Sequence, residues 1–393
     1  AILLLDLPQS MNEFHPSPST KRPLRYRMDR LIRDLVMGVI IRLLSGKGAH
    51  EVALNGQTPK RILLVRPNFR IGNAILTMPA VAAFHKNFPT ATIDFVGSSV
   101  SRLLLENQPL AQHYEAPRRF PQVLWGYAGL LRRLRANRYD LAVDVSCSQS
   151  GLASFIMVFS GARVRVGCAG KWDQAFNLKV AKLGEVNKYR KLSEFLKVLR
   201  LEGVDEVGSL NFTSGELSFG RSRIEAAVGN VTRPVIGVFV GGRKLRGKRW
   251  PIENFVAVAN GLSQRGYTVV TFVGPEEMDL AGELKDALGA GAIVICEPSL
   301  RVFAAMVSHL ALFICCDSGP MHLACTVGTR VLAIFRTRDV ERWAPPAQAA
   351  RIVCGDQTVS ADEVLRAALE ELSMAEKFLT KRTGGALIQS GHA

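Results

Sequence analysis

Short, continuously apolar segments alternate with helical patterns along most of this chain, and that alternation restricts the fold more than any other feature. RILLVRP (61–67), ATIDFVG (91–97) and YDLAVDVS (139–146) have the composition of strands that are buried on both faces. AILTMPAVAAFHKN (74–87) lies between the first two and has the spacing of a helix. Apolar strands that alternate with helices indicate a parallel sheet covered on both faces.

The alternation restarts after a polar, irregular stretch at 203–233. The expected strands of this second block lie at 235–242, 267–274, 292–297, 312–316 and 330–335, and the expected helices at 251–266, 275–289, 300–311 and 320–328. The pattern therefore predicts an α/β protein with two doubly wound domains, each built on its own parallel sheet.

The same pattern divides the chain into four parts. A basic extension occupies 1–58, one Rossmann-like domain 59–215, a second 233–355, and a helix with a tail 356–393. Ser360 has the residue type of a cap for that last helix. Ligands bind at the carboxyl ends of strands in open α/β sheets, so we expect the functional site in a cleft between the two domains.

The net charge of +16 predicts an anionic partner. Two basic segments suit an anionic membrane surface. Segment 21–47 has eight Lys/Arg at helical spacing, and 117–138 has six Arg with Trp125 and Tyr127. The alternatives are a helix packed on the body for the first and a solvated helix face for the second. Known nucleic-acid-binding signatures are missing, which argues against nucleic acid as the partner.

The localisation expected from the sequence is cytoplasmic and peripheral to a membrane. The first twenty residues lack a basic segment before their apolar run, so they do not resemble a secretory signal. No apolar run approaches the ~18 residues of a membrane span. Six of the seven cysteines lie in apolar stretches and none forms a CxxC pair, which favours reduced, buried thiols over a disulfide or zinc framework.

The stretch FICCDSGPMHLACTVGT places four chemically useful residues where a strand passes into a helix. Asp317 or Ser318 can cap the helix, and Gly319 lets the backbone approach a ligand. The free N–H groups of the helix start favour an anion, and His322 can donate to a phosphate or a hydroxyl. The alternative is an ordinary strand-to-helix turn with a good cap.

Two more loops follow expected strands. GGRKLRGKRWP (241–251) contains five cations, among them Lys248, which suit a diphosphate, although a charge run is often only a solvated face. FVGPEEMD (272–279) offers Glu276 or Glu277 to ribose or sugar hydroxyls, although acids also favour the first turn of any helix. Neither a P-loop nor a GxGxxG motif accompanies these loops.

Three motifs together resemble glycosyltransferase family 9, the bacterial heptosyltransferases that build the lipopolysaccharide inner core. DSGPMHLACTVGTRVLAIF is similar to the family's D-S/T-G-x-x-H-x-A-x-x-x-G-x-P-x-x-x-x-F, with Arg330 in place of its usual Pro. KRWPIENF resembles K-x-W-P-x-E-x-F, and VRPNFRIGNAILTMPAV resembles the first-strand motif that ends G-D-x-x-x-T-x-P-A. The resemblance covers roughly residues 61–350 and implies the GT-B fold of two facing Rossmann-like domains.

The resemblance also implies roles for individual residues. Lys248 would meet the donor diphosphate, Glu277 (or Glu276) the ribose, and the tetrad of Asp317, Ser318, Gly319 and His322 the phosphate and sugar end of a nucleotide-sugar. The implied donor is ADP-L-glycero-D-manno-heptose, which is a substrate, so no cofactor or metal is expected. The implied reaction is an inverting transfer to a lipopolysaccharide-type acceptor at the cytoplasmic face of the inner membrane.

One position departs from the family pattern. The residue after Gly72 is Asn73, where the family has the Asp proposed as its base, and an amide cannot take a proton at neutral pH. Asp144 is the best local substitute and His85 a weaker one, although Asp144 is also placed to cap a turn. A slow, water-mediated enzyme and a non-catalytic nucleotide-sugar-binding protein stay open.

Arg66 and Arg70 flank the same loop as Asn73 and are expected to grip the carboxylates or phosphates of an acidic acceptor. A sugar 2-epimerase on the same two-domain fold is a rival to the transferase. It needs paired acids beside a His in the cleft, and the motifs do not supply that set.

Overall fold

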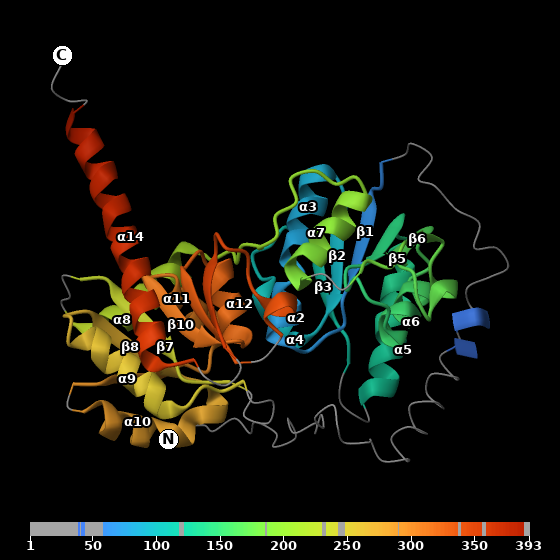
Figure 1. The fold of residues 1–393 in the computed structure, drawn as a ribbon. Coiled ribbons are helices and arrows are strands. Elements are labelled where there is room, and N and C mark those ends of the chain that lie inside the picture. Colours follow the sequence, from blue (N-terminus) through green and yellow to red (C-terminus); the bar gives the residue numbers. More distant parts are fainter. Residues whose placement is uncertain are drawn as a thin grey trace.

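The computed structural model describes residues 38–39, 41–43, 58–117, 122–184, 187–229, 233–242, 248–289, 291–336, 339–355 and 359–388, with the side chains of 122–125 and 375–388 excluded. Most of the basic extension and cations 243–247 of the Gly-Gly loop therefore lie outside the described residues. The chain forms two halves that lie side by side (Figure 1).

The first half is built on one parallel sheet in the order β3-β2-β1-β4-β5-β6. Its strands are β1 (Arg61–Val65), β2 (Thr92–Gly97), β3 (Gln112–Glu115), β4 (Leu141–Asp144), β5 (Val164–Cys168) and β6 (Leu178–Val180). Its helices are α2 (Ile71–Ile75), α3 (Met78–Asn87), α4 (Ser99–Leu104), α5 (Gln122–Ala136), α6 (Gly151–Phe159), the 3₁₀ turn η1 (Asp173–Ala175) and α7 (Lys188–Val198).

The second half repeats this topology, with the parallel order β12-β11-β10-β7-β8-β9. Its strands are β7 (Val235–Phe239), β8 (Thr268–Val273), β9 (Ile293–Cys296), β10 (Leu312–Cys316), β11 (Val331–Phe335) and β12 (Ala350–Cys354). Its helices are α8 (Ser214–Val228), α9 (Ile252–Ser263), η3 (Pro275–Leu280), α10 (Ala281–Leu288), α11 (Leu300–Val307), α12 (Gly319–Thr326), α13 (Val340–Trp343) and α14 (Ala361–Ile388). Both orders are those of doubly wound Rossmann-type sheets, which confirms the predicted fold class.

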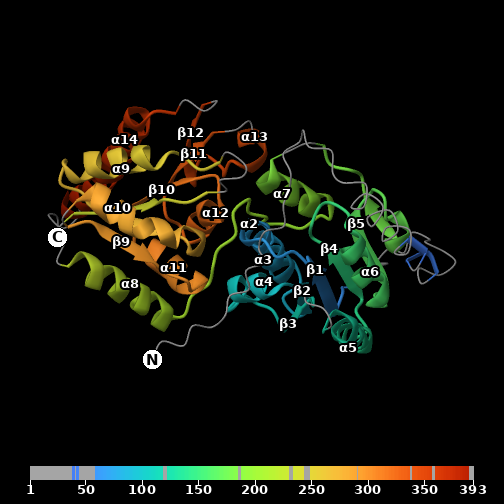
Figure 2. The same ribbon diagram turned by 90° about the horizontal axis from the view of Figure 1, so that it is seen from below.

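The strands are continuously apolar because helices cover both faces of each sheet (Figure 2). In β1, Ile62 and Leu64 enter one buried cluster, whereas Leu63 and Val65 enter another on the opposite face. Successive side chains of a strand point to opposite faces, so a strand buried on both needs an apolar residue at every position.

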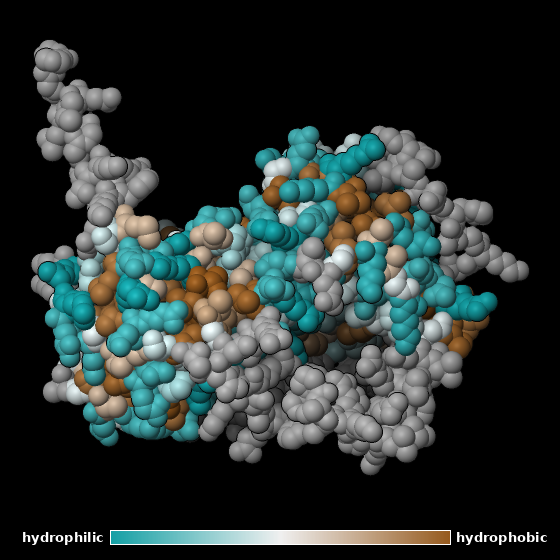
Figure 3. Space-filling view, in the orientation of Figure 1, coloured by the Kyte–Doolittle hydropathy of each residue, from teal (hydrophilic) through white to brown (hydrophobic). Residues whose placement is uncertain are grey.

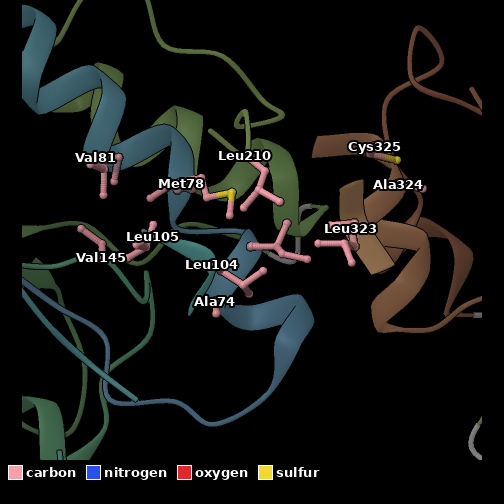
Figure 4. Close-up of a cluster of buried hydrophobic side chains, with 14 of the residues drawn as sticks. Ala74, Met78, Val81, Leu104, Leu105, Val145, Leu210, Leu323, Ala324 and Cys325 are labelled. Carbon is pink, nitrogen blue, oxygen red and sulfur yellow. The ribbon is translucent and has the colours of Figure 1, made fainter. Parts of the chain in front are cut away.

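One of these apolar clusters continues from the first half into the second. Ala74 and Met78, from α2 and α3, belong to the same cluster as Leu323, Ala324 and Cys325 of α12 (Figure 4). The two halves therefore share buried apolar surface next to the carboxyl ends of their central strands.

Two expected helices are each divided. The helix predicted over 74–87 is a short α2 followed by α3, which has a proline in its first turn. Pro79 has no N–H to donate to Ile75, so the chain restarts the helix at this point. The segment predicted over 275–289 begins as the 3₁₀ turn η3 and continues as α10. The predicted cap of α14 is confirmed, because Ser360 Oγ accepts the backbone N–H of Glu363 at 3.2 Å.

The membrane-facing reading of α5 is wrong for the apolar side chains that the structure describes. Leu130, Leu131 and Leu134 are buried and pack on the first sheet, and only the arginine side of the helix is exposed. In segment 21–47, the described Ile41 is buried in the same cluster as Leu130 and Leu134, which favours packing on the body at this residue. Both segments thus direct described apolar groups inward.

Within the described part of the chain, every helix is too short or too polar to cross a bilayer. On the face seen in Figure 3, hydrophobic residues form patches among hydrophilic ones on both halves. All seven cysteines are free, as expected, but Cys354 is exposed and Cys296 half-buried because each lies at the end of an outer strand of the second sheet.

Candidate active site

The start of α12 lies at the carboxyl end of β10, the central position where the strand order of the second sheet reverses. Ser318 occupies the N-cap position in an extended conformation, but its hydroxyl makes no capping bond. The expected side-chain cap is therefore wrong, and the buried Ser318 Oγ has no hydrogen-bond partner. Buried hydroxyls are rarely left unsatisfied, so this one is suited to a ligand.

Lys248 lies between two carboxylates beside this helix start. Its buried ammonium forms a hydrogen-bonded ion pair with Asp317 and lies 2.9 Å from Asp339. The structure thus brings together Lys248 and Asp317, which the sequence placed in two separate motifs. An ammonium has three donors, so a ligand oxygen can share this group with the two carboxylates.

Glu277, rather than Glu276, points into the protein. Glu277 is 6% exposed and lies 3.7 Å from the Arg249 guanidinium, whereas Glu276 is exposed. Burial raises the pKa of Glu277, and the N–H of Gly242 and the charge of Arg249 oppose that rise. The Nε atoms of Arg249 and Arg336 are buried without partners, so this edge of the second sheet holds donors suited to an anion.

His322 is not an exposed donor in the first turn of α12, as the sequence suggested, because it is buried where the two halves meet. Its Nδ1 lies 2.5 Å from the hydroxyl of Tyr189, which comes from α7 of the first half. Burial, followed by the nearby charge of Lys248, lowers the pKa of His322 to about 4, so the imidazole is neutral at pH 7. The edge of its ring meets Trp343, with the two ring centroids 6.1 Å apart.

Gly72 and Asn73 of the first half lie against this histidine. A Cβ atom on Gly72 would stand 2.8 Å from Cδ2 of His322, which is closer than packed atoms approach. The next residue, Asn73, donates its side-chain N–H to Asn68 Oδ1 at 3.1 Å. The turn that carries the family's base position is therefore in contact with the helix that carries the donor motif.

Asp144 lies at the end of β4, behind the Arg66 side chain. Its carboxylate accepts the backbone N–H of Ser146 at 3.0 Å, which is the turn-capping arrangement named as its alternative role. Burial raises the pKa of Asp144 to about 6, and the bonds from Ser146 and the charge of Arg66 oppose that rise. The other candidate base, His85, is exposed on α3 and does not line the cavity described next.

A cavity of about 310 Å³ opens beside Asn73. Its lining includes five cations: Arg66, Arg70, Lys188, Lys191 and Arg342. None of the described residues that line it is acidic. The structure therefore brings the two predicted acceptor residues together with three cations that the motifs did not indicate.

Arg342 and Trp343 reach this cavity from α13 of the second half. The amide of Asn187, next to Lys188, donates to the carbonyl oxygens of Glu341 and Ala344, at 3.2 Å and 2.8 Å. These bonds fix α13 against the start of α7. The basic composition of KYRKLSEF (188–195) was the available signal for α7, but the sequence gives no sign that α13 meets it.

Among the described residues, no three His, Cys, Asp or Glu side chains gather in a way that could hold a metal ion. The chemistry that this arrangement supports is therefore built from hydrogen-bond donors and cations. A set of unpaired donors lies at the second sheet, a basic cavity lies at the first, and His322 with Gly72 lies between them.

Comparison with known proteins agrees with this geometry. The family model described as Glycosyltransferase family 9 (heptosyltransferase) matches residues 127–372. Lipopolysaccharide heptosyltransferase 3 of Escherichia coli is 27% identical over 289 residues, which cover 70% of this chain and 83% of that protein. Lipopolysaccharide heptosyltransferase 2 of E. coli K12 is 23% identical over 317 residues, covering 75% and 87%.

Two solved structures share the fold. The glycosyl transferase family 9 protein from Veillonella parvula superimposes with a TM-score of 0.72 and 20% identity, covering 80% of this chain and 98% of that one. The E. coli ADP-heptose lipopolysaccharide heptosyltransferase II gives a TM-score of 0.65 and 18% identity, covering 80% and 99%.

Proposed function

Because the chain belongs to glycosyltransferase family 9, we propose that it transfers a sugar from a nucleotide-sugar to an acidic, lipid-linked acceptor. Heptose from ADP-heptose and the lipopolysaccharide inner core are the best single assignment, since the relatives reported above are lipopolysaccharide heptosyltransferases. One observation carries the proposal: His322 of the donor motif packs directly on Gly72, beside the basic cavity expected to hold the acceptor.

The chemistry proposed is a single displacement that inverts the anomeric carbon. The acceptor hydroxyl attacks that carbon while the bond to the donor diphosphate breaks, so negative charge grows on the leaving diphosphate. Lys248 and the unpaired Nε atoms of Arg249 and Arg336 are suited to stabilise that charge, and buried cations do so most effectively where water is excluded.

The acceptor hydroxyl must also lose a proton during this displacement. Asn73 can accept a hydrogen bond from the hydroxyl and orient it, but cannot take the proton. Asp144, with its pKa of about 6, is ionised over most of the population at pH 7 and is the nearer of the two substitute bases. Because it lies behind Arg66 and does not line the cavity, its route to the hydroxyl would run through water.

A second candidate function is a nucleotide-sugar-binding protein that does not catalyse transfer, and Asn73 is the observation that favours it. One experiment separates the two. Calorimetry with ADP-, UDP- and GDP-sugars identifies the donor, and transfer is then measured with wild type, Asn73→Asp and Asn73→Ala. Turnover by wild type, or gained only with Asn73→Asp, supports the transferase. Donor binding without turnover in any of the three supports the binding protein, and absence of nucleotide-sugar binding contradicts both.

We further propose that the protein works at the cytoplasmic face of the inner membrane. Arg132, Arg133 and Arg135 are exposed on α5 and suit an anionic surface by charge alone. Sedimentation with vesicles containing anionic lipid checks this. Binding that falls with salt and with the triple change of these arginines to Gln supports the proposal, and unchanged binding contradicts this surface.

A further inference from the structure

The cavity beside Asn73 is too positively charged for a ligand with one anionic group. Its five cations have one nearby carboxylate, Asp144, which lies behind Arg66. The Nε atom of Arg66 is buried without a partner, which leaves a donor of this guanidinium unsatisfied. Like charges held together destabilise a fold unless an anion joins them.

The size of the cavity limits what that anion can be. About 310 Å³ is at the small end of ligand pockets and accommodates a single substituted sugar ring rather than an oligosaccharide. A phosphoryl group carries roughly −1.5 to −2 at pH 7. One such group leaves a net excess of about two positive charges after Asp144 is counted, whereas two groups nearly neutralise the cavity.

The cations come from both halves of the protein. Arg66 and Arg70 follow β1, and Lys188 and Lys191 belong to α7, whereas Arg342 is contributed by α13 of the second half. The guanidinium carbon of Arg342 lies 5.6 Å from the centroid of the Trp343 ring, and Lys188 Nζ lies 5.9 Å from the same centroid. Trp343 therefore holds two cations of different halves beside one ring.

We propose that this cavity recognises a sugar that bears two anionic groups, phosphoryl or carboxylate, and that Arg342 of the nucleotide-sugar half completes the site for the second group. The acceptor thereby joins the two halves, because its charge is shared between them. The identification of the ligand as a sugar rests on the proposed function, whereas the requirement for two anionic groups rests on the cavity itself.

Calorimetry on the full chain tests this with a hexose 1,6-bisphosphate, the hexose 6-phosphate and the unmodified hexose, each titrated in the presence of saturating ADP so that the donor site is occupied. The expected order is bisphosphate at least tenfold tighter than monophosphate, with the hexose weakest. Equal affinity for the bisphosphate and the monophosphate overturns the inference.

Arg342→Gln provides the second arm, and Arg132→Gln, an exposed arginine on α5, is the charge-matched control. Arg342→Gln should reduce bisphosphate affinity to near the monophosphate level and leave monophosphate affinity within twofold, while Arg132→Gln changes neither. An equal loss in the two variants reduces the effect to net charge and overturns the inference. Failure of ADP to bind, with the bisphosphate preference retained, would instead count against the proposed function.

Discussion

The hydroxyl of Tyr189 lies 2.5 Å from Nδ1 of His322, and this contact joins α7 of the first half to the donor-motif helix α12 of the second. Both groups are neutral at pH 7, because burial raises the pKa of Tyr189 and lowers that of His322. A phenol is the better donor and an imidazole nitrogen the better acceptor, so we expect Tyr189 to donate to Nδ1. That assignment leaves the proton of His322 on Nε2.

Tyr189→Phe should therefore disturb His322 without removing it. Loss of one buried hydrogen bond costs about 1 kcal/mol, or roughly fivefold in kcat/KM if it acts on the transition state. Kinetics and the ¹⁵N shifts of labelled His322 check this together. The matched control is Tyr139→Phe, which removes a 2.6 Å bond to Asp94 on the far side of the first sheet. Equal effects of the two changes on turnover would contradict a positioning role for Tyr189.

Gly72→Ala should be harmful for a different reason. The added methyl group would lie 2.8 Å from the His322 ring, which is buried and bonded and so has little room to move. Overpacking of this kind costs about 1–3 kcal/mol. Thermal unfolding and kcat measure the loss. His322→Ala should remove the clash, so the double variant should be no less stable than His322→Ala alone, and additive losses would show that the strain lies elsewhere.

Lys248 has both a structural and a proposed binding role, which paired variants can separate. Lys248→Met leaves Asp317 and Asp339 without their shared cation, and breaking a buried pair typically costs about 3–5 kcal/mol. Adding Asp317→Asn removes much of that penalty. We expect the double variant to recover stability in thermal unfolding but not ADP affinity in calorimetry. Recovery of both would show that Lys248 supports the fold and does not contact the donor.

The sequence predicted those parts of the protein that depend on local pattern. The two sheets follow from strands such as β1 and β10, and the Asp317–Gly319 turn follows from the junction of an apolar run with a proline-led helix. The break between α2 and α3 was also readable from Pro79, because a proline there lacks the N–H of a continuous helix.

The remainder depends on how the two halves meet, which local pattern does not reveal. Tyr189, Arg342 and Trp343 are ordinary residues of amphipathic helices until α7 and α13 are brought together. The burial of His322 has the same cause, since the first half covers α12. The reading of α5 failed because its leucines suit either a membrane or the sheet beneath, and tertiary packing chose the sheet.

Arg301 joins the halves on a second contact and should control stability in acid. Its guanidinium, 7% exposed, makes bonds of 2.5 Å and 2.8 Å to the Glu216 carboxylate, and it also donates to the carbonyl oxygen of Leu103 in the first half at 3.0 Å. The bond from Arg301 lowers the pKa of Glu216 to about 2, from an ordinary 4.5.

A carboxylate whose pKa is depressed on folding stabilises the protein above its unfolded pKa, and that contribution is lost as the pH falls. The Glu216 contribution should thus be complete above pH 4.5 and disappear towards pH 2. Glu216→Gln should lower the free energy of unfolding at pH 7 by about 1–3 kcal/mol and flatten its dependence over this acid range. Denaturant unfolding at several pH values measures both, and a wild-type slope that persists in Glu216→Gln would assign the acid transition to another group.

Lys188 should make acceptor binding sensitive to alkaline pH. Burial, together with the charges of Lys191, Arg342 and Arg66, lowers its pKa to about 8, while Cys147 acts in the opposite direction. Lys188 therefore carries its charge at pH 7 and loses it as the pH rises through 8, whereas a phosphoryl group stays ionised throughout this range. The affinity for an anionic acceptor should fall several-fold between pH 7 and 9. Lys188→Arg keeps a permanent charge and should abolish that fall, while Lys188→Met should weaken binding at pH 7 to the wild-type value at pH 9. A pH dependence that is unchanged in Lys188→Arg would show that the titrating group is not Lys188.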